Sequence, residues 1–276
     1  MRRVRLGKML TDARRKAGKS REDAAAHADT SVSTVMRWET GRTTIKPGNL
    51  KFLIGFYGIA EDSEQATEML QLAKEGRQRG WYAGAGGGLR DSYRTLLGLE
   101  EDALGEEEFA AVLIPGLLQT SDYARAIHLA AVPTLDNAVI DERLKVRDER
   151  QERFFGRPES AELHVVLDAG CALRRVGGDQ VWRAQLNHLV TMSEQRSVTI
   201  QVLPFDVGAH AGTLGAFLVL RFAEMDPVAY LEVPAGDIFA EGIPASQYRD
   251  RFTALRTVAL PPTQSVAWLQ QVANAE

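Results

Sequence analysis

The sequence predicts an α+β protein in which an all-α domain of five helices precedes a mixed α/β domain. Apolar residues recur at helical spacing through residues 1–79. β-branched and apolar runs typical of strands appear from residue 163 onward. The glycine-rich stretch "GWYAGAGGGLRDS" lies between these regions. We therefore expect domains at residues 1–79 and 93–276, joined by a flexible linker at residues 80–92.

The two regions carry opposite net charge. Residues 1–60 contain 13 Lys and Arg against 5 Asp and Glu, a net charge of +8. Subtracting these from the chain totals of 33 and 37 leaves 20 basic and 32 acidic residues in 61–276, a net charge of −12. The basic region would attract a polyanion such as nucleic acid, and the acidic remainder would limit nonspecific adhesion.

The first two expected helices have recognisable ends. Gly18 is expected to end the first helix, because glycine readily adopts the left-handed conformation found there. The apolar face of that helix is formed by Leu6, Met9, Leu10, Ala13 and Ala17. Ser20, followed by Asp23 three residues later, approximates a capping box and begins the second helix.

Ser31 is expected to cap a third helix that stops at Gly41. At about 100° per residue, burying Val35 and Trp38 turns the other face of this helix outward. The residues on that outward face are Ser33, Met36, Arg37 and Thr40. Pro47 suits the first turn of a fourth helix, and residues 63–79 read as a fifth.

Two short helices joined by a tight turn are typical of the helix-turn-helix, whose second helix enters the major groove of DNA. Arg37 is the expected base reader, because a guanidinium can donate two hydrogen bonds to guanine. Val32 and Ser33, at the start of the helix, are the other candidate base contacts. Candidate phosphate contacts are Arg21, Thr34, Thr40, Arg42 and Lys46. The alternative is an ordinary helical bundle with a solvated basic face.

The segment "SREDAAAHADTSVSTVMRWETGR", residues 20–42, resembles the XRE (Cro-like) repressor family. The resemblance covers about residues 4–60 and implies a five-helix domain that binds double-stranded operator DNA as a homodimer. Arg21 stands where the family usually has glutamine, and an arginine there can still reach a phosphate, although less selectively.

The second domain is expected to combine helices with strands at residues 163–168, 198–205, 217–222 and 229–233. The acidic run "EEDALGEEE", residues 100–108, is expected to be solvated surface. A calcium site, or a cover for the basic N-terminal face, is the alternative for this run.

The block "LIPGLLQTSDYARAI", residues 113–127, followed by "VTIQVLPFDVGAHAG", resembles the C-terminal domain of actinobacterial XRE-type regulators, which are sometimes described as antitoxin-like. The resemblance implies modulation by a small acidic partner protein or a ligand. Phe109-Ala110 and Ala169 depart from that family's usual polar residues. Candidate ligand or partner contacts are Gln119, Tyr123, Arg125 and His210.

The sequence argues against an enzyme. His164 and Asp168 would share one face of a strand, but Cys171 lies beyond its end, and a lone cysteine is usually a small buried hydrophobe. The other histidines have no zinc-like spacing. We expect no metal and no cofactor. Neither a signal peptide nor a membrane-spanning run is recognisable, so a cytoplasmic location without membrane association is expected.

Together these features predict a homodimeric, DNA-binding transcriptional regulator. The alternative is an antitoxin-like protein that sequesters a small cognate partner and uses DNA binding only to regulate its own operon. Co-purification with the product of a neighbouring gene would favour the alternative.

Overall fold

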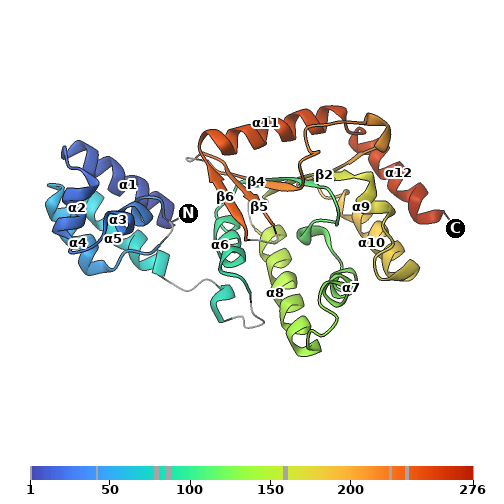
Figure 1. Ribbon diagram of the computed structural model, residues 1–276, viewed down its shortest axis with the longest axis horizontal. Helices are drawn as coiled ribbons and strands as arrows, with labels where there is room; N and C mark the ends of the chain where they lie inside the picture. Colours follow the sequence, from blue (N-terminus) through green and yellow to red (C-terminus); the bar gives the residue numbers. More distant parts are fainter. Residues whose placement is uncertain are drawn as a thin grey trace. The chain divides into compact units, whose positions relative to one another are not determined.

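The computed structural model describes residues 2–41, 43–77, 81–84, 89–157, 161–223, 226–233 and 236–275. The chain divides into two compact units, Met1–Gly84 and Ala85–Glu276, which are coloured blue to cyan and cyan to red in Figure 1. Part of the expected linker, at residues 80 and 85–88, lies outside the described residues. Trp81–Gly84 form a short 3-10 helix.

The described part of unit 1 consists of five α-helices, as predicted. They are α1 (Arg2–Lys16), α2 (Arg21–His27), α3 (Val32–Glu39), α4 (Pro47–Phe56) and α5 (Glu64–Arg77). The caps that the sequence indicated are present: Ser20 and Asp23 form a reciprocal capping box, and the side chain of Ser31 accepts a hydrogen bond from the amide of Thr34. Gly18 and Gly41 have φ values of 66° and 69°, which allow helices α1 and α3 to end.

The core of unit 1 forms where the apolar faces of these helices meet. Val35 and Trp38 are buried, as the helical spacing predicted. Gly7 of α1 lies against the backbone carbonyls of Trp38 and Glu39, so closely that a Cβ atom at this position would overlap them. The absent side chain therefore lets α1 support the end of α3 directly.

Unit 2 is built on one six-stranded sheet with the order β3-β2-β1-β4-β5-β6. The strands are β1 (Gly105–Ala110), β2 (Glu162–Asp168), β3 (Val198–Leu203), β4 (Phe217–Arg221), β5 (Val228–Leu231) and β6 (Ile238–Glu241). Strands β1, β2 and β3 are parallel, and β4, β5 and β6 continue the sheet with antiparallel pairing. The fold class is therefore α+β, as predicted.

Helices cover both faces of this sheet. In Figure 1, α11 (Ile243–Val258) crosses one face. The helices on the opposite side are α6 (Asp91–Glu100), α7 (Ser121–Ala131), α8 (Asn137–Phe155), α9 (Ala169–Leu173) and α10 (Gly178–Met192), and α12 (Pro262–Asn274) packs beside α10. Within the described residues, no helix has both the length and the apolar composition needed to span a bilayer.

The prediction of a solvated acidic run at residues 100–108 holds for Glu101, which is exposed, and is wrong for Glu100 and for the three glutamates at 106–108. Glu100 ends α6 and is buried, and Glu106, Glu107 and Glu108 lie in β1, between β2 and β4. Strand β1 and the short strand β6 were not predicted. Three consecutive glutamates give β1 no apolar alternation in the sequence, and the arginines near its carboxylates, Arg150 and Arg221, lie far away along the chain.

Candidate nucleic-acid interface

Helix α3 presents a polar face at the surface of unit 1. Val32, Ser33, Met36 and Arg37 are exposed, while Val35 and Trp38 anchor the opposite face in the core. The three predicted base contacts therefore lie together on one helix face. This exposed face carries a guanidinium and two apolar side chains, so it can place hydrogen-bond donors on base edges and apolar atoms on thymine methyl groups.

The side chain of Arg37 is held by the helix itself. Its Nη2 donates a hydrogen bond of 3.0 Å to Oγ1 of Thr34, one turn earlier. Oγ of Ser31 lies 2.9 Å from both Oγ1 of Thr34 and Oγ of Ser33. This hydroxyl network directs the guanidinium toward the N-terminus of α3, which is the end that reads bases in helix-turn-helix proteins. Sequence reasoning placed Thr34 on a phosphate and missed its contact with Arg37.

A buried ion pair fixes α3 against the rest of unit 1. Glu39, whose side chain is 2% exposed, accepts hydrogen bonds from Nε of Arg14 at 2.5 Å and from Nε of Arg21 at 2.7 Å. Although burial opposes ionisation of Glu39, the hydrogen bonds from the two arginines lower the pKa of its carboxyl below the ordinary value. Glu39 therefore joins α1, α2 and α3 through charged hydrogen bonds.

The predicted phosphate contacts divide into three groups. Arg21 has its Nε engaged by Glu39, and Oγ1 of Thr40 donates a 2.8 Å hydrogen bond to the carbonyl of Met36. Lys46 is exposed and precedes α4, whose N-terminus has no side-chain cap. Arg42 lies outside the described residues. Lys46 is thus an exposed cation beside the uncapped amides of α4, an arrangement suited to a phosphate.

The ligand or partner candidates of unit 2 do not form one group. Gln119 and Tyr123 are buried, and both bind the backbone of Ile114, through Nε2 of Gln119 at 2.6 Å and the hydroxyl of Tyr123 at 3.5 Å. Arg125 pairs with Asp141 on the surface. His210 packs edge-on against Phe109, on the sheet face opposite Tyr123. Tyr123 is fully buried and so is not accessible to a partner in this conformation.

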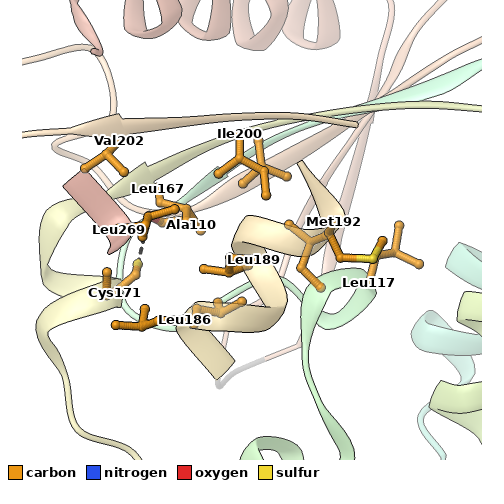
Figure 2. Packing of buried hydrophobic residues seen from close by; sticks show 14 of the residues in the cluster. Ala110, Leu117, Leu167, Cys171, Leu186, Leu189, Met192, Ile200, Val202 and Leu269 are labelled. Atoms are coloured by element: carbon orange, nitrogen blue, oxygen red, sulfur yellow. Dashed lines mark hydrogen bonds between the residues drawn. The ribbon is translucent and has the colours of Figure 1, made fainter. Parts of the chain in front are cut away.

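The Cys171 thiol lies in the core of unit 2. Figure 2 shows it among Leu186, Leu269 and Ala110, with its Sγ donating a 3.1 Å hydrogen bond to the carbonyl of Ala110. Burial raises the pKa of this thiol to about 12. His164 instead contacts Gln201 and Phe252, on the face covered by α11. The structure thus separates the histidine from the cysteine that the sequence placed seven residues later.

A buried charged cluster, which sequence reasoning missed, lies where β1 faces α6 and α8. Arg150 of α8 pairs with Glu100, and its Nε lies 2.8 Å from Oε2 of that residue, while its Nη2 lies 4.0 Å from Oε1 of Glu106. Glu106 is fully buried, and neither of its oxygens has a hydrogen-bond partner among the described residues. Burial and the nearby charge of Glu100 raise the pKa of Glu106 well above its ordinary value, and burial raises the pKa of Glu108 to about 7.

Glu106→Gln is expected to make the stability of unit 2 less dependent on pH. Folding raises the pKa of these two carboxyls, so the folded state binds more protons and the free energy of unfolding falls as the pH rises from about 4.5 through 7. Each proton taken up on folding contributes a slope of about 1.4 kcal/mol per pH unit. The variant should be more stable than the wild type at pH 8. Denaturant unfolding at a series of pH values from 5 to 8 measures the difference.

The exposed Glu152 of α8 offers the control, because Glu152→Gln removes a carboxylate that is in water in both states. Its pH profile should match the wild type. A Glu106→Gln profile as steep as that of the wild type would show that Glu106 takes up no proton on folding.

Two family models match the chain. One, described as a helix-turn-helix domain, matches residues 5–66, which contain the whole of α2, α3 and α4. The other, described as a domain of unknown function (DUF5753), matches residues 93–271, which contain the whole sheet of unit 2. No curated protein and no solved structure matched the chain. The first match supports DNA binding by unit 1.

Proposed function

Because the chain belongs to the family defined by the domain DUF5753 and carries a helix-turn-helix domain before it, we propose that it is a sequence-specific transcriptional regulator of the XRE type. It binds operator DNA as a homodimer, since one recognition helix reads one half-site. The observation that carries the proposal is the exposed face of α3, on which Thr34 holds the guanidinium of Arg37 beside Ser33.

Arg37→Ala is expected to remove discrimination at one base pair in each half-site. The loss should be about 1–3 kcal/mol per half-site on the preferred duplex, because a bidentate contact to guanine disappears. The same variant should bind a duplex mutated at that base pair nearly as well as the wild type does. Fluorescence anisotropy with the preferred and mutated duplexes measures both quantities.

Lys46→Ala provides the matched control, because it removes one exposed positive charge beside a helix N-terminus without touching α3. It should weaken binding to all duplexes alike and lower the slope of log affinity against log salt by about 1. Equal losses for Arg37→Ala on preferred and scrambled duplexes would contradict base reading by Arg37.

We propose that unit 2 binds a small acidic partner protein or a ligand and performs no chemistry. Exposed apolar side chains support a binding surface: Val112 and Phe205, 54% and 64% exposed, follow the parallel strands β1 and β3 at their carboxyl ends. Exposed apolar side chains at such an edge are typical of binding sites. The buried thiol of Cys171 supports the absence of cysteine catalysis. If a neighbouring gene encodes a small acidic protein, failure of the chain to co-elute with that protein would contradict the partner proposal.

A further inference from the structure

Helix α4 exposes a stripe that no described residue of unit 1 covers. Gly48, Phe52 and Gly55 follow one another at spacings of four and three residues, so they lie on one face of the helix, and all three are exposed. Phe52 is 64% exposed, more than any other large apolar side chain described in unit 1. A Cβ atom added at Gly48 or at Gly55 would meet nothing within 4 Å.

The stripe consists of one protruding aromatic ring flanked by two stretches of bare helix backbone. The phenyl ring of Phe52 projects from the surface, while Gly48 and Gly55 leave the backbone of α4 bare on either side of it. A surface with both features can match a copy of itself, because the ring of one copy can lie over the glycine backbone of the other. Two-fold association of identical surfaces requires this kind of self-complementarity.

The charges beside the stripe indicate how two copies would be oriented. Lys51 is exposed within α4, and the turn after α4 carries the exposed acids Glu61 and Asp62. These three residues form no ion pair with another described residue of the chain. An antiparallel crossing of two α4 helices brings Lys51 of each copy toward Glu61 and Asp62 of the other, whereas a parallel crossing brings like charges together.

We propose that α4 is the surface through which two copies of this chain associate, crossing antiparallel near Gly55 with Phe52 of each copy on the glycine face of the other. The inference deepens the proposed homodimer and rests on it. Since α4 follows α3 in the same compact unit, this contact couples the two recognition helices directly, without relying on unit 2.

Two variants of the full chain test the surface from opposite directions. Phe52→Ser removes the protruding ring. Gly55→Gln covers the bare backbone at position 55 with a side chain that has open space in the isolated unit. Gly55→Gln also improves the helix propensity of α4, so loss of folding is not its expected effect. Each variant should raise the dimer dissociation constant at least tenfold in sedimentation velocity, with an unchanged circular dichroism spectrum.

Ile243→Ser in unit 2 is the control, because Ile243 is 77% exposed and lies outside α4. It should leave the dissociation constant unchanged. Lys51→Glu should weaken the dimer, and Lys51→Glu combined with Glu61→Lys should restore it by reversing both members of each pair. A dimer unaffected by Phe52→Ser and Gly55→Gln would place the interface elsewhere and overturn this inference, while the proposed homodimer would stand.

A covalent test locates the contact independently. Cys171 is fully buried, so Gly55→Cys adds an accessible thiol near the expected two-fold axis. Mild oxidation should convert this variant, but not Ile243→Cys, into a disulfide-linked dimer. A wild-type chain that is monomeric at all concentrations and on its operator would overturn both the α4 interface and the homodimer, yet would leave base reading by Arg37 intact.

Discussion

Arg150→Ala is expected to lower the free energy of unfolding of unit 2 by about 3–5 kcal/mol, the usual cost of removing one partner from a buried ion pair. The guanidinium of Arg150 is the nearest positive charge to Glu100 and lies 4.0 Å from Glu106. Both carboxyls are buried, so water cannot replace the arginine without opening the sheet from α8. Denaturant unfolding followed by circular dichroism measures the loss.

Arg153→Ala is the matched control on the same helix. Arg153 pairs with Glu149 one turn away, and the two side chains are 49% and 43% exposed, so removal of Arg153 should change stability by no more than about 0.5 kcal/mol. A second comparison uses Arg150→Met together with Glu100→Gln, which removes both charges and should recover part of the loss. Losses that simply add in the double variant would contradict a coupled pair.

Glu39→Ala is expected to destabilise unit 1 by a similar amount, about 3–5 kcal/mol. The variant leaves the charge of Arg14, whose side chain is only 10% exposed, without its carboxylate partner. The variant should also weaken DNA binding, since Glu39 joins the end of α3 to α1 and α2. Hydrogen exchange of the α3 amides, combined with anisotropy on the operator, measures both effects.

The contribution of Glu39 to the stability of unit 1 should depend on pH with the opposite sign to the contribution of Glu106 to unit 2. Folding lowers the pKa of the Glu39 carboxyl. The stabilisation that Glu39 provides is therefore complete above the pKa of this carboxyl in the unfolded chain, and it is lost as the pH falls through its pKa in the folded chain. Glu39→Gln should therefore reduce the acid sensitivity of unit 1. Asp12→Ala, an exposed change on α1, should alter neither stability nor acid sensitivity. Unit 1 variants at Glu39 that remained as stable as the wild type would show that the ion pair does not hold α3.

The helices of unit 1 could be predicted because their signals are local. The capping residues Ser20 and Ser31, the helix-ending glycines Gly18 and Gly41, and the spacing of Val35 and Trp38 all lie within a few residues of the structure they specify. The exposed face of α3 follows from that spacing. The three candidate base contacts were therefore placed on one surface by sequence reasoning.

The central strand of unit 2 could not be predicted because its determinants are distant. Strand β1 contains Glu106, Glu107 and Glu108, which by composition favour a solvated segment. Their counter-charges come from Arg150, more than 40 residues later, and from Arg221 of β4, whose Nε lies 3.3 Å from Oε1 of Glu107. Only the assembled sheet shows that these carboxylates are enclosed.

Two contacts in unit 1 were missed for the same reason. The close approach of Gly7 to the carbonyls of Trp38 and Glu39 joins residues more than 30 positions apart, and no local pattern marks that glycine. Arg21, at the start of α2, was expected to hold a phosphate, yet its Nε is bound by Glu39. A single sequence carries no signal for either pairing.

Base reading by the exposed face of α3 can be tested with duplex DNA and the purified chain alone. The most direct measurement is the affinity of the purified full chain for duplexes from its own promoter and for scrambled duplexes of equal composition, at low and moderate salt. We expect at least tenfold tighter binding to a promoter duplex. This preference should persist as salt weakens both complexes, and Arg37→Ala should abolish it. Equal affinity for promoter and scrambled duplexes, or no binding to either at low salt, would contradict base reading by α3.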